Sequence, residues 1–251
     1  MRTISTILLT LLVTMPVMAQ QTSDSLFASW LDEQALVIER SPVYQFREES
    51  NRTLQSRSGE RNFDLVTFYN VDLRIPTFTF DLSSVSIDGR QVPTPDRSQL
   101  RRGVIEPVTR LLTEIPSFLS AVSMANMEVA GPISADSLRG FGESRRIKLL
   151  PKDERHPIAN VLLWFDPSEN RVVAARIAFR NLPPRRTRGR RSDRPKKMRP
   201  PRLFARFERV EGLDLPVGVR VRGIVPAQIR GRTTHIQLTQ TSRYFDYTFG
   251  E

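Results

Sequence analysis

The sequence predicts an α+β fold in which an antiparallel β-sheet packs against helices. Most of the chain alternates apolar and polar residues with a period of two, as strands do when one sheet face covers a core and the other faces solvent. Two segments, 23–37 and 98–128, instead have apolar residues at three- and four-residue spacing, as amphipathic helices do. The predicted order is helix, strands, helix, strands, with about nine or ten strands.

The first nineteen residues have the layout of a secretory signal peptide. Arg2 gives a positive start, Ile4 to Val13 are mostly apolar, and Val17-Met-Ala19 places small or apolar residues where a signal peptidase cleaves. The segment is too short to span a membrane. We therefore expect cleavage after Ala19 and a single domain over residues 20–251.

The chain contains no cysteine, and this limits its chemistry. Without cysteine there is no disulfide, no thiol catalysis, no thiolate metal site and no acylated lipoprotein anchor. The absence of cysteine from an exported chain of this size indicates a protein of the bacterial cell envelope. We expect a free periplasmic protein with no transmembrane helix.

The N-terminal elements follow from a change of period. Ser23 to Val37 predict the first helix, which Ser41-Pro42 ends. Segments 43–56 and 61–75 then predict a long hairpin, and 76–88 continue as extended chain to the Asp88-Gly89 turn. The apolar stripe of the helix consists of Phe27, Trp30, Leu31, Ala35 and Ile38.

The second predicted helix, 98–128, carries a longer apolar stripe. The stripe consists of Val104, Val108, Leu111, Ile115, Phe118 and Val122. Pro116 should kink this helix or split it. The helix either faces the core or is mobile and lines or covers a cavity.

From Gly140 the chain predicts a strand meander. The predicted strands are about 141–150, 158–165, 171–181, 202–211, 216–225, 231–240 and 242–249. Their alternation separates apolar from basic positions, with arginines at Arg176, Arg180, Arg220 and Arg222. The opposing apolar sets are Val173, Ala175, Ile177 and Phe179, and Val217, Val219, Val221 and Val225.

Most of the net charge of +11 lies in one segment. Residues 183–202 hold ten Lys or Arg residues and one Asp, a net of +9, which leaves +2 for the rest of the chain. Five prolines in this segment predict an exposed, extended hairpin loop. The loop either has no specific partner or contacts an anionic surface. Its contact residues are then Arg185, Arg186, Arg188, Arg190, Arg191, Arg194, Lys196, Lys197 and Arg199.

The sequence contains few signs of catalysis. Neither His156 nor His235 has a second histidine at ligand spacing, and no nucleophile elbow, phosphate loop or dinucleotide fingerprint occurs. Most of the scattered aspartates, Asp166 and Asp214 among them, are predicted at turns, where local hydrogen bonding explains them. We expect no enzyme, no metal and no cofactor.

The apolar faces of the sheet and of helix 98–128 can pack in two ways. They form either a filled core or a groove that holds acyl chains, and periodicity does not separate the two. Each buried methylene contributes about 0.8 kcal/mol, so a chain of modest length binds without a polar motif. The groove residues are then Val108, Leu111, Ile115, Phe118, Phe207, Val219, Val221, Ile236, Leu238 and Phe245, with Tyr247 on the same face.

Several C-terminal stretches resemble the outer-membrane lipoprotein-sorting proteins and their LolA/LolB-like relatives. The stretches are VLLWFDPSENRVV at 161–173, FERVEGLDLPV at 207–217, and the final strands at 233–239 and 243–247. The resemblance implies an open, strongly curved half-barrel of antiparallel strands over most of residues 22–249. Helices lie inside its concave face, and it holds lipid or acyl chains. The 183–202 insertion is not typical of that family, and the arginine that its carriers use inside the cavity has no matched position here.

Together these observations predict a non-enzymatic periplasmic protein that binds a lipid or acyl chain between the sheet and helix 98–128. The resemblance implies a role in lipoprotein or lipid transfer to the outer membrane. The expected partners are lipid or lipoprotein acyl chains and an anionic membrane surface or other envelope polyanion, and no nucleic acid. The alternative is an envelope interaction or scaffold protein with a filled core, whose basic loop is the contact site.

Overall fold

The computed structural model describes residues 22–56, 59–74, 77–93, 119–137, 142–166, 168–180, 200–229 and 232–250. The predicted signal peptide, most of the predicted helix 98–128 and nearly all of the basic loop 183–202 lie outside these residues. These three remain predictions.

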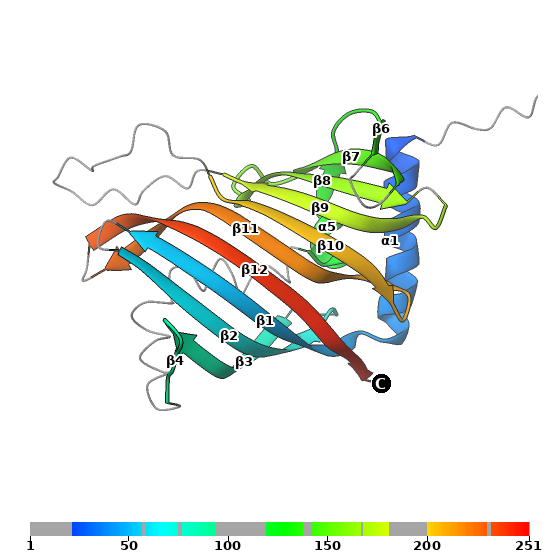
Figure 1. Cartoon of the computed structure of the whole chain (residues 1–251). Helices are drawn as coiled ribbons and strands as arrows, with labels where there is room; N and C mark the ends of the chain where they lie inside the picture. Colours follow the sequence, from blue (N-terminus) through cyan, green and yellow to red (C-terminus); the bar gives the residue numbers. More distant parts are fainter. Residues whose placement is uncertain are drawn as a thin grey trace, which may run out of the picture.

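One antiparallel sheet of twelve strands dominates the molecule (Figure 1). Its strand order is β4-β3-β2-β1-β12-β11-β10-β9-β8-β7-β5, with β6 also paired to β7, so the sheet is open. Pairing of β1 with β12 joins the two ends of the chain in the middle of the sheet. The first strands are β1 (Val43–Ser56), β2 (Gly59–Asp72), β3 (Thr77–Ile87), β4 (Arg90–Gln91), β5 (Met127–Val129) and β6 (Ser134–Ser137). The others are β7 (Glu143–Pro151), β8 (Ile158–Asp166), β9 (Arg171–Phe179), β10 (Arg202–Val210), β11 (Leu213–Ile229) and β12 (Arg232–Gly250).

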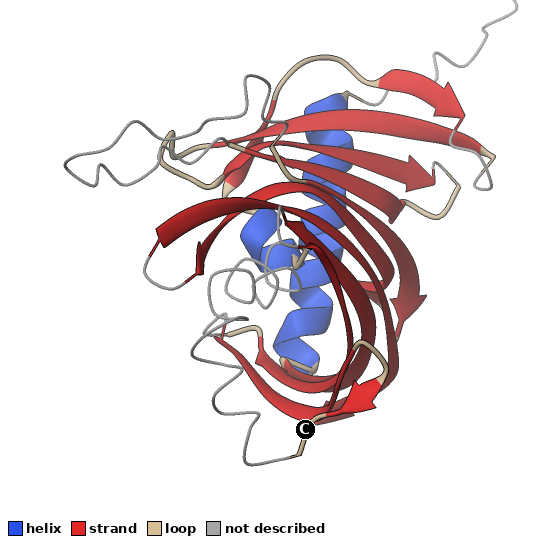
Figure 2. Cartoon of the chain, turned by 60° about the vertical axis from the view of Figure 1, so that its left-hand side comes forward, coloured by secondary structure: helices blue, strands red, loops and turns tan. Residues whose placement is uncertain are grey.

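The main core lies on one face of this sheet, which we call the core face; the opposite face is the outer face. Figure 2 shows helix α1 (Ser23–Arg40) and the short helix α5 (Ala121–Met124) beside the curved sheet. Both helices contribute buried side chains to this core. Their contributions pack with apolar side chains of most of the strands. The mostly antiparallel, curved α+β architecture predicted from the sequence is therefore present.

Helix α1 forms as its sequence predicts. The Thr22 side chain caps the helix by accepting a hydrogen bond from Ser25 N at 3.2 Å, and Asp24 in the first turn suits the positive end of the helix dipole. Leu26, Phe27 and Trp30 are buried against the sheet. The helix continues three residues beyond the predicted end at Val37, to Arg40.

The N-terminal hairpin also follows the prediction. β1 has the predicted bounds, and β2 is shifted to 59–72, with Gly59 the register partner of Ser56. Alternation along β2 directs Leu65, Tyr69 and Val71 to the interior. The hairpin is the long, one-sided amphipathic ribbon that the period of two indicates.

Two predicted element boundaries are wrong. The expected strands 231–240 and 242–249 are one strand, β12, because Thr241 pairs with Asn51 and keeps the ladder continuous. In the described part of the segment 98–128, only Ala121–Met124 are helical. The helix ends there because Met127–Val129 pair with β7 as strand β5.

A bulge also corrects the predicted face of one valine. Where β8 pairs with β9, Trp164 lies opposite Ala174 and Phe165 lies opposite Val172. Val173 is the extra residue, so it packs with Trp164 and Ala174 in a small apolar cluster apart from the main core. Val172 takes the core position that the alternation assigned to Val173.

Candidate functional site

The sequence-predicted groove residues of the sheet fall into two groups. Phe207, Val219, Val221, Ile236 and Leu238 are all buried and belong to one apolar cluster on the core face. The structure thus brings five predicted residues together. The helical residues Val108, Leu111, Ile115 and Phe118 lie outside the described residues.

Phe245 is the exception, and its predicted position on the apolar face is wrong. Its ring lies on the outer face, where the guanidinium carbons of Arg47 and Arg243 are 5.2 and 5.8 Å from its centroid. A bulge between β1 and β12 follows it, with Asp246 at φ 56°. The bulge moves the next odd-numbered residue, Tyr247, to the core side, where it packs against the main cluster.

A group of polar residues lies in the middle of the core face, on the paired strands β1 and β12. We call Glu48, Ser50, Arg52, Gln240 and Ser242 the polar cluster; all five are buried. The register places Ser50 opposite Ser242 and Arg52 opposite Gln240. The cluster is therefore two strands wide.

Apolar residues flank the polar cluster on both sides. On β11, Val219 is the register partner of Ser242 and Val221 is the partner of Gln240. On β2, Phe63 is the partner of Arg52. The polar cluster is thus bordered by apolar side chains on β11 and, beside Arg52, on β2, while Thr67 of β2 is the register partner of Glu48.

The acidic end of the polar cluster is satisfied by hydrogen bonds. The Tyr69 hydroxyl donates to Glu48 Oε2 at 2.7 Å, and Gln240 Nε2 donates to Glu48 Oε1 at 3.3 Å. Gln240 Nε2 also donates to Ser242 Oγ at 2.7 Å. These contacts hold the buried carboxylate in place and turn the Gln240 amide so that its NH₂ faces both acceptors.

At the other end of the polar cluster, three buried atoms have no hydrogen-bond partner among the described residues. The Arg52 side chain is buried, and its Nε has no hydrogen-bond partner among the described residues. The same holds for Ser50 Oγ and for Gln240 Oε1, whose backbones lie beside or opposite that of Arg52. Glu48 is four residues from Arg52 along β1, about 13 Å at the rise of a strand, too far for a hydrogen-bonded pair.

Electrostatics connect the polar cluster to two buried tyrosines. Burial raises the pKa of Tyr69 well above 10, and the charge of Glu48 raises it further, while Arg52 acts in the opposite sense. Burial and Glu48 raise the pKa of Tyr244 in the same way. Both phenols therefore stay protonated, which leaves the Tyr69 hydroxyl as a donor to Glu48.

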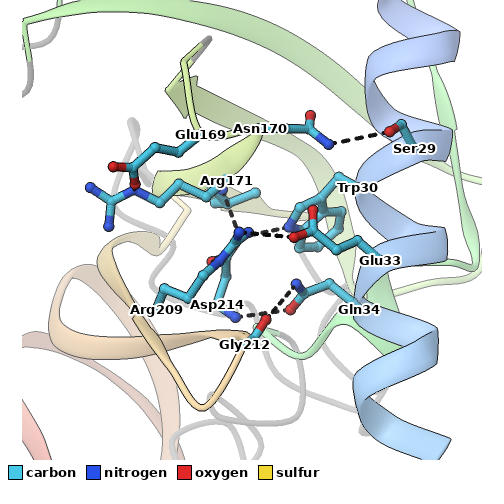
Figure 3. Close-up of polar contacts among 11 residues, drawn as sticks. Ser29, Trp30, Glu33, Gln34, Glu169, Asn170, Arg171, Arg209, Gly212 and Asp214 are labelled. Carbon is cyan, nitrogen blue, oxygen red and sulfur yellow. Dashed lines mark hydrogen bonds and ion pairs between the residues drawn. The ribbon is translucent and has the colours of Figure 1, made fainter.

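A second buried polar group, around Asp214, connects α1 to the sheet (Figure 3). Asp214 Oδ2 accepts hydrogen bonds from Trp30 Nε1 at 2.7 Å and from Val172 N at 2.8 Å, and Oδ1 accepts from Arg209 Nε at 2.9 Å. Arg209 also pairs with Glu33 of α1 at 2.9 Å. Since each carboxylate oxygen is already engaged, this group fixes the helix rather than offering a ligand site.

Gln34 completes this connection between the helix and the sheet. Its Oε1 accepts from Asp214 N at 2.9 Å, and its Nε2 donates to Gly212 O at 3.2 Å. The turn here is Glu211-Gly212, with φ values of 49° and 86°, so Asp214 lies in β11 and not in the predicted turn. Its long-range role has no local sequence signal.

Other candidate features are weaker. A surface cleft of about 500 Å³ lies between the start of α1 and the segment that follows β5, and is lined by Thr22, Ser23, Asp24, Val129, Gly131, Pro132 and Ile133. Burial lowers the pKa of His156, whose Nδ1 accepts from Ile158 N at 3.2 Å in a local turn. Among the described residues, no group of three or more His, Cys, Asp or Glu side chains is placed to hold a metal ion.

Neither of the two described helices is both long enough and apolar enough to cross a membrane.

Sequence reasoning missed the polar cluster, although one signal was available. The residues of β1 that face the core are Tyr44, Phe46, Glu48, Ser50 and Arg52. Residues on the same side of this strand therefore change from aromatic to polar. Charged residues at positions that the alternation directs to the core indicate a functional or structural polar site. The pairing of β1 with β12, which assembles the cluster, has no such signal.

The comparisons with known proteins found solved structures that are similar to this chain. No family model and no curated protein matches the chain. A DUF1329 family protein from Desulfovibrio piger ATCC 29098 is 10% identical, with 89% of this chain and 92% of that chain covered and a TM-score of 0.43. An outer membrane lipoprotein-sorting protein domain from Vibrio parahaemolyticus is 8% identical, with 89% and 93% covered and a TM-score of 0.40.

The MucA/MucB complex of Pseudomonas aeruginosa is a more distant match, 11% identical with 88% and 94% covered and a TM-score of 0.22. The family that the sequence resembles is thus represented among the similar structures. At these identities and TM-scores, likeness identifies neither a ligand nor an activity.

Proposed function

We propose that this protein binds a lipid or other acyl-chain amphiphile on the core face of its sheet, without catalysing a reaction. The acyl chain contacts the apolar residues around Val221 and Leu238, and a polar group of the ligand contacts Arg52. The helices then cover the concave side of the sheet, as the resemblance implies. No cofactor is part of this proposal.

The observation that carries the proposal is Arg52. It is 5% exposed, has no hydrogen-bond or ion-pair partner among the described residues, and lies beside the apolar side chain of its register partner Phe63. Burying an unpaired charge costs several kcal/mol, and such a cost is retained where a ligand supplies the missing partner. A carboxylate, phosphate or ester oxygen of an amphiphile supplies that partner.

The surroundings of Arg52 suit the remainder of an amphiphile. Val221 is the register partner of Gln240, which lies opposite Arg52, and Val221 and Leu238 belong to the buried apolar cluster on the core face. Each methylene removed from water contributes about 0.8 kcal/mol, so an acyl chain adds most of the affinity and Arg52 with Ser50 fixes the orientation. Glu48, four residues away on the same strand, disfavours an anionic group at the opposite end of the polar cluster.

The cellular setting of the proposal comes from the sequence. The predicted signal peptide at 1–19 supports export to the periplasm, where transfer of a lipid or lipoprotein to the outer membrane is the role that the resemblance implies. The basic loop at 183–202 then contacts an anionic membrane surface. Nucleic acid is not an expected partner.

A second candidate function rests on the same loop. Its net charge of +9 supports an envelope interaction or scaffold protein whose contact site is the loop and whose core is filled. Deletion of 183–202 distinguishes the two functions. A scaffold loses its partner, whereas a carrier keeps its ligand and loses only membrane association.

The test of the main proposal is organic extraction of the purified protein followed by mass spectrometry. We expect an acyl-chain amphiphile in an amount close to that of the protein. Absence of any such lipid, together with no binding of a fluorescent fatty acid by the extracted and refolded protein, contradicts the proposal.

A further inference from the structure

The outer face of the sheet carries a group of exposed arginines, on the side opposite the polar cluster. We call Arg176 of β9, Arg202 of β10, and Arg220 and Arg222 of β11 the arginine face; all four are exposed. They surround Phe204, which is half-buried in the middle of β10.

The register fixes how close these side chains lie. Phe204 is the register partner of Arg176 on one side and of Arg220 on the other, and Arg202 is the partner of Arg222. Neighbouring strands are about 4.8 Å apart, so three guanidinium-bearing strands lie within about 10 Å. Directly opposed like charges such as Arg202 and Arg222 destabilise a sheet, so the arrangement opposes folding stability.

No acidic side chain of the described residues forms an ion pair with this group. Within the described part of the chain, Arg176, Arg202, Arg220 and Arg222 form no ion pair and no side-chain hydrogen bond. Other arginines do have carboxylate partners, as Arg209 has in Asp214 and Glu33. This face therefore carries four exposed cations that have no ion-pair partner among the described residues.

Apolar side chains border the arginine face. Trp164 of β8 packs edge-on against Phe204 with ring centroids 6.4 Å apart, and Leu162 lies opposite Arg176 in the register. Leu162 and Phe204 are partly exposed beside the buried Trp164. The face therefore combines four cations with a small amount of accessible apolar surface.

We propose that the arginine face docks the protein on an anionic phospholipid bilayer. The guanidinium groups bind headgroup phosphates, for which arginine has the matching fork of donors, and Phe204 and Leu162 lie at the level of the interface. The site is on the opposite sheet face from the polar cluster, so docking and ligand binding can occur together. It shares only Arg202, the first residue of β10, with the basic segment 183–202.

The arrangement of the face favours a bilayer over a single nucleic-acid strand. The cations spread along β11, from Arg220 to Arg222, and across three strands, as they must to meet a surface of phosphates. A single strand of nucleic acid needs open aromatic faces on which bases stack. Trp164 is only 5% exposed and Phe204 is flanked by arginines, so neither ring offers such a platform.

The test is co-sedimentation of the full chain with vesicles of phosphatidylglycerol and phosphatidylcholine, and with vesicles of phosphatidylcholine alone. We expect binding to the anionic vesicles only, weakened by salt. The variant with Arg176→Gln, Arg202→Gln, Arg220→Gln and Arg222→Gln should bind at least about tenfold more weakly. A matched variant with Arg40→Gln, Arg61→Gln, Arg74→Gln and Arg90→Gln, which removes the same charge from exposed positions elsewhere, should bind nearly as the parent does.

Two further measurements keep the outcome interpretable. The single variant Arg220→Gln should show a smaller loss in the same direction, which guards against a folding defect of the fourfold variant. Affinity for a fluorescent fatty acid should be unchanged in both the fourfold and the single variant. This measurement therefore distinguishes a failure of the docking proposal from a failure of the proposed interior ligand site.

The proposal is overturned if the fourfold variant binds anionic vesicles as well as its matched control does, with or without residues 183–199. It is also overturned if the fourfold variant loses binding only to a single-stranded oligonucleotide or to soluble polyphosphate. In that case the arginine face serves a soluble polyanion and not a bilayer.

Discussion

The indole Nε1 of Trp30 donates a hydrogen bond to Oδ2 of Asp214 across 2.7 Å, between residues 184 positions apart in the chain. This contact joins the first helix to the C-terminal half of the sheet in the buried core. The Asp214 carboxylate also accepts from Arg209 and from Val172 N, so one side chain of β11 connects the helix with β9 and β10.

Substitution Asp214→Asn should therefore destabilise the fold. The amide keeps the shape but presents an NH₂ group to the donors of Trp30 and Arg209 and leaves Arg209 partly unpaired. We expect the free energy of unfolding to fall by about 3 kcal/mol, as for a broken buried pair. Urea unfolding followed by tryptophan fluorescence measures this. The control Asp88→Asn, at an exposed turn, should change stability by less than about 1 kcal/mol, and equal effects of the two substitutions would contradict the assigned role.

Because of its four tyrosines, the folded protein should lose stability at high pH. Burial raises the pKa of Tyr44, Tyr69, Tyr244 and Tyr247 above the ordinary value of 10. In the unfolded chain the phenols ionise near pH 10, so above that pH the unfolded state loses protons that the folded state keeps. The stability is fully present below pH 10 and falls as the pH rises towards the folded pKa values.

Absorbance at 295 nm and circular dichroism, recorded together during an alkaline titration, test this. Phenolate should appear only as the far-ultraviolet signal is lost. A tyrosine that titrates reversibly near pH 10 in the folded protein would show that it is not buried as described.

Gly223 of β11 should tolerate no side chain. A Cβ at this position would lie 2.4 Å from Pro201 Cα, a backbone atom that cannot rotate away. We expect Gly223→Ala to cost about 2 kcal/mol or more of unfolding free energy through this overlap. Gly218→Ala on the same strand is the control, because its Cβ would meet only Ser242 O at 3.9 Å. Thermal unfolding of both variants should show a loss for Gly223→Ala alone; a stable Gly223→Ala protein would mean that β11 and the chain at Pro201 are not in contact.

Arg52→Met should make the ligand-free protein more stable. Methionine keeps much of the side-chain volume and removes a buried cation that lacks a partner among the described residues. We expect a gain of about 1–3 kcal/mol in the unfolding free energy of delipidated protein, measured with urea. Arg61→Met, at an exposed position of the same hairpin, serves as the control. A loss of several kcal/mol for Arg52→Met would show that the guanidinium is already paired.

Much of the fold could be predicted because its elements have strong local patterns. The apolar stripe of α1 and the alternation in β1, β8, β9 and β10 placed these elements within a few residues of their observed bounds. Bulges were not predictable, since they depend on the partner strand. A bulge accounts for the wrong face of Val173, and the bulge after Phe245 is the reason that Tyr247 lies on the core face and Phe245 does not.

The candidate site was less predictable than the fold. The apolar residues Val219, Val221, Ile236 and Leu238 were identified from alternation, and they share one core cluster. The polar cluster was not identified, because Ser50 and Arg52 meet Ser242 and Gln240 only through the pairing of the first and last strands. Pairing over such a sequence distance depends on the whole chain and leaves no periodic signal.

The most direct test of the central claim is a binding titration of delipidated protein with a fluorescent fatty acid, comparing Arg52→Gln with Arg61→Gln. If Arg52 binds the polar group of an amphiphile, Arg52→Gln should raise the dissociation constant at least about tenfold, the effect of losing one charge-assisted hydrogen bond. Arg61→Gln, on the same hairpin but exposed, should leave it unchanged. Equal affinities for the two variants and the parent protein would contradict the claim that Arg52 is the ligand's partner, and no binding by the parent would contradict the amphiphile site itself.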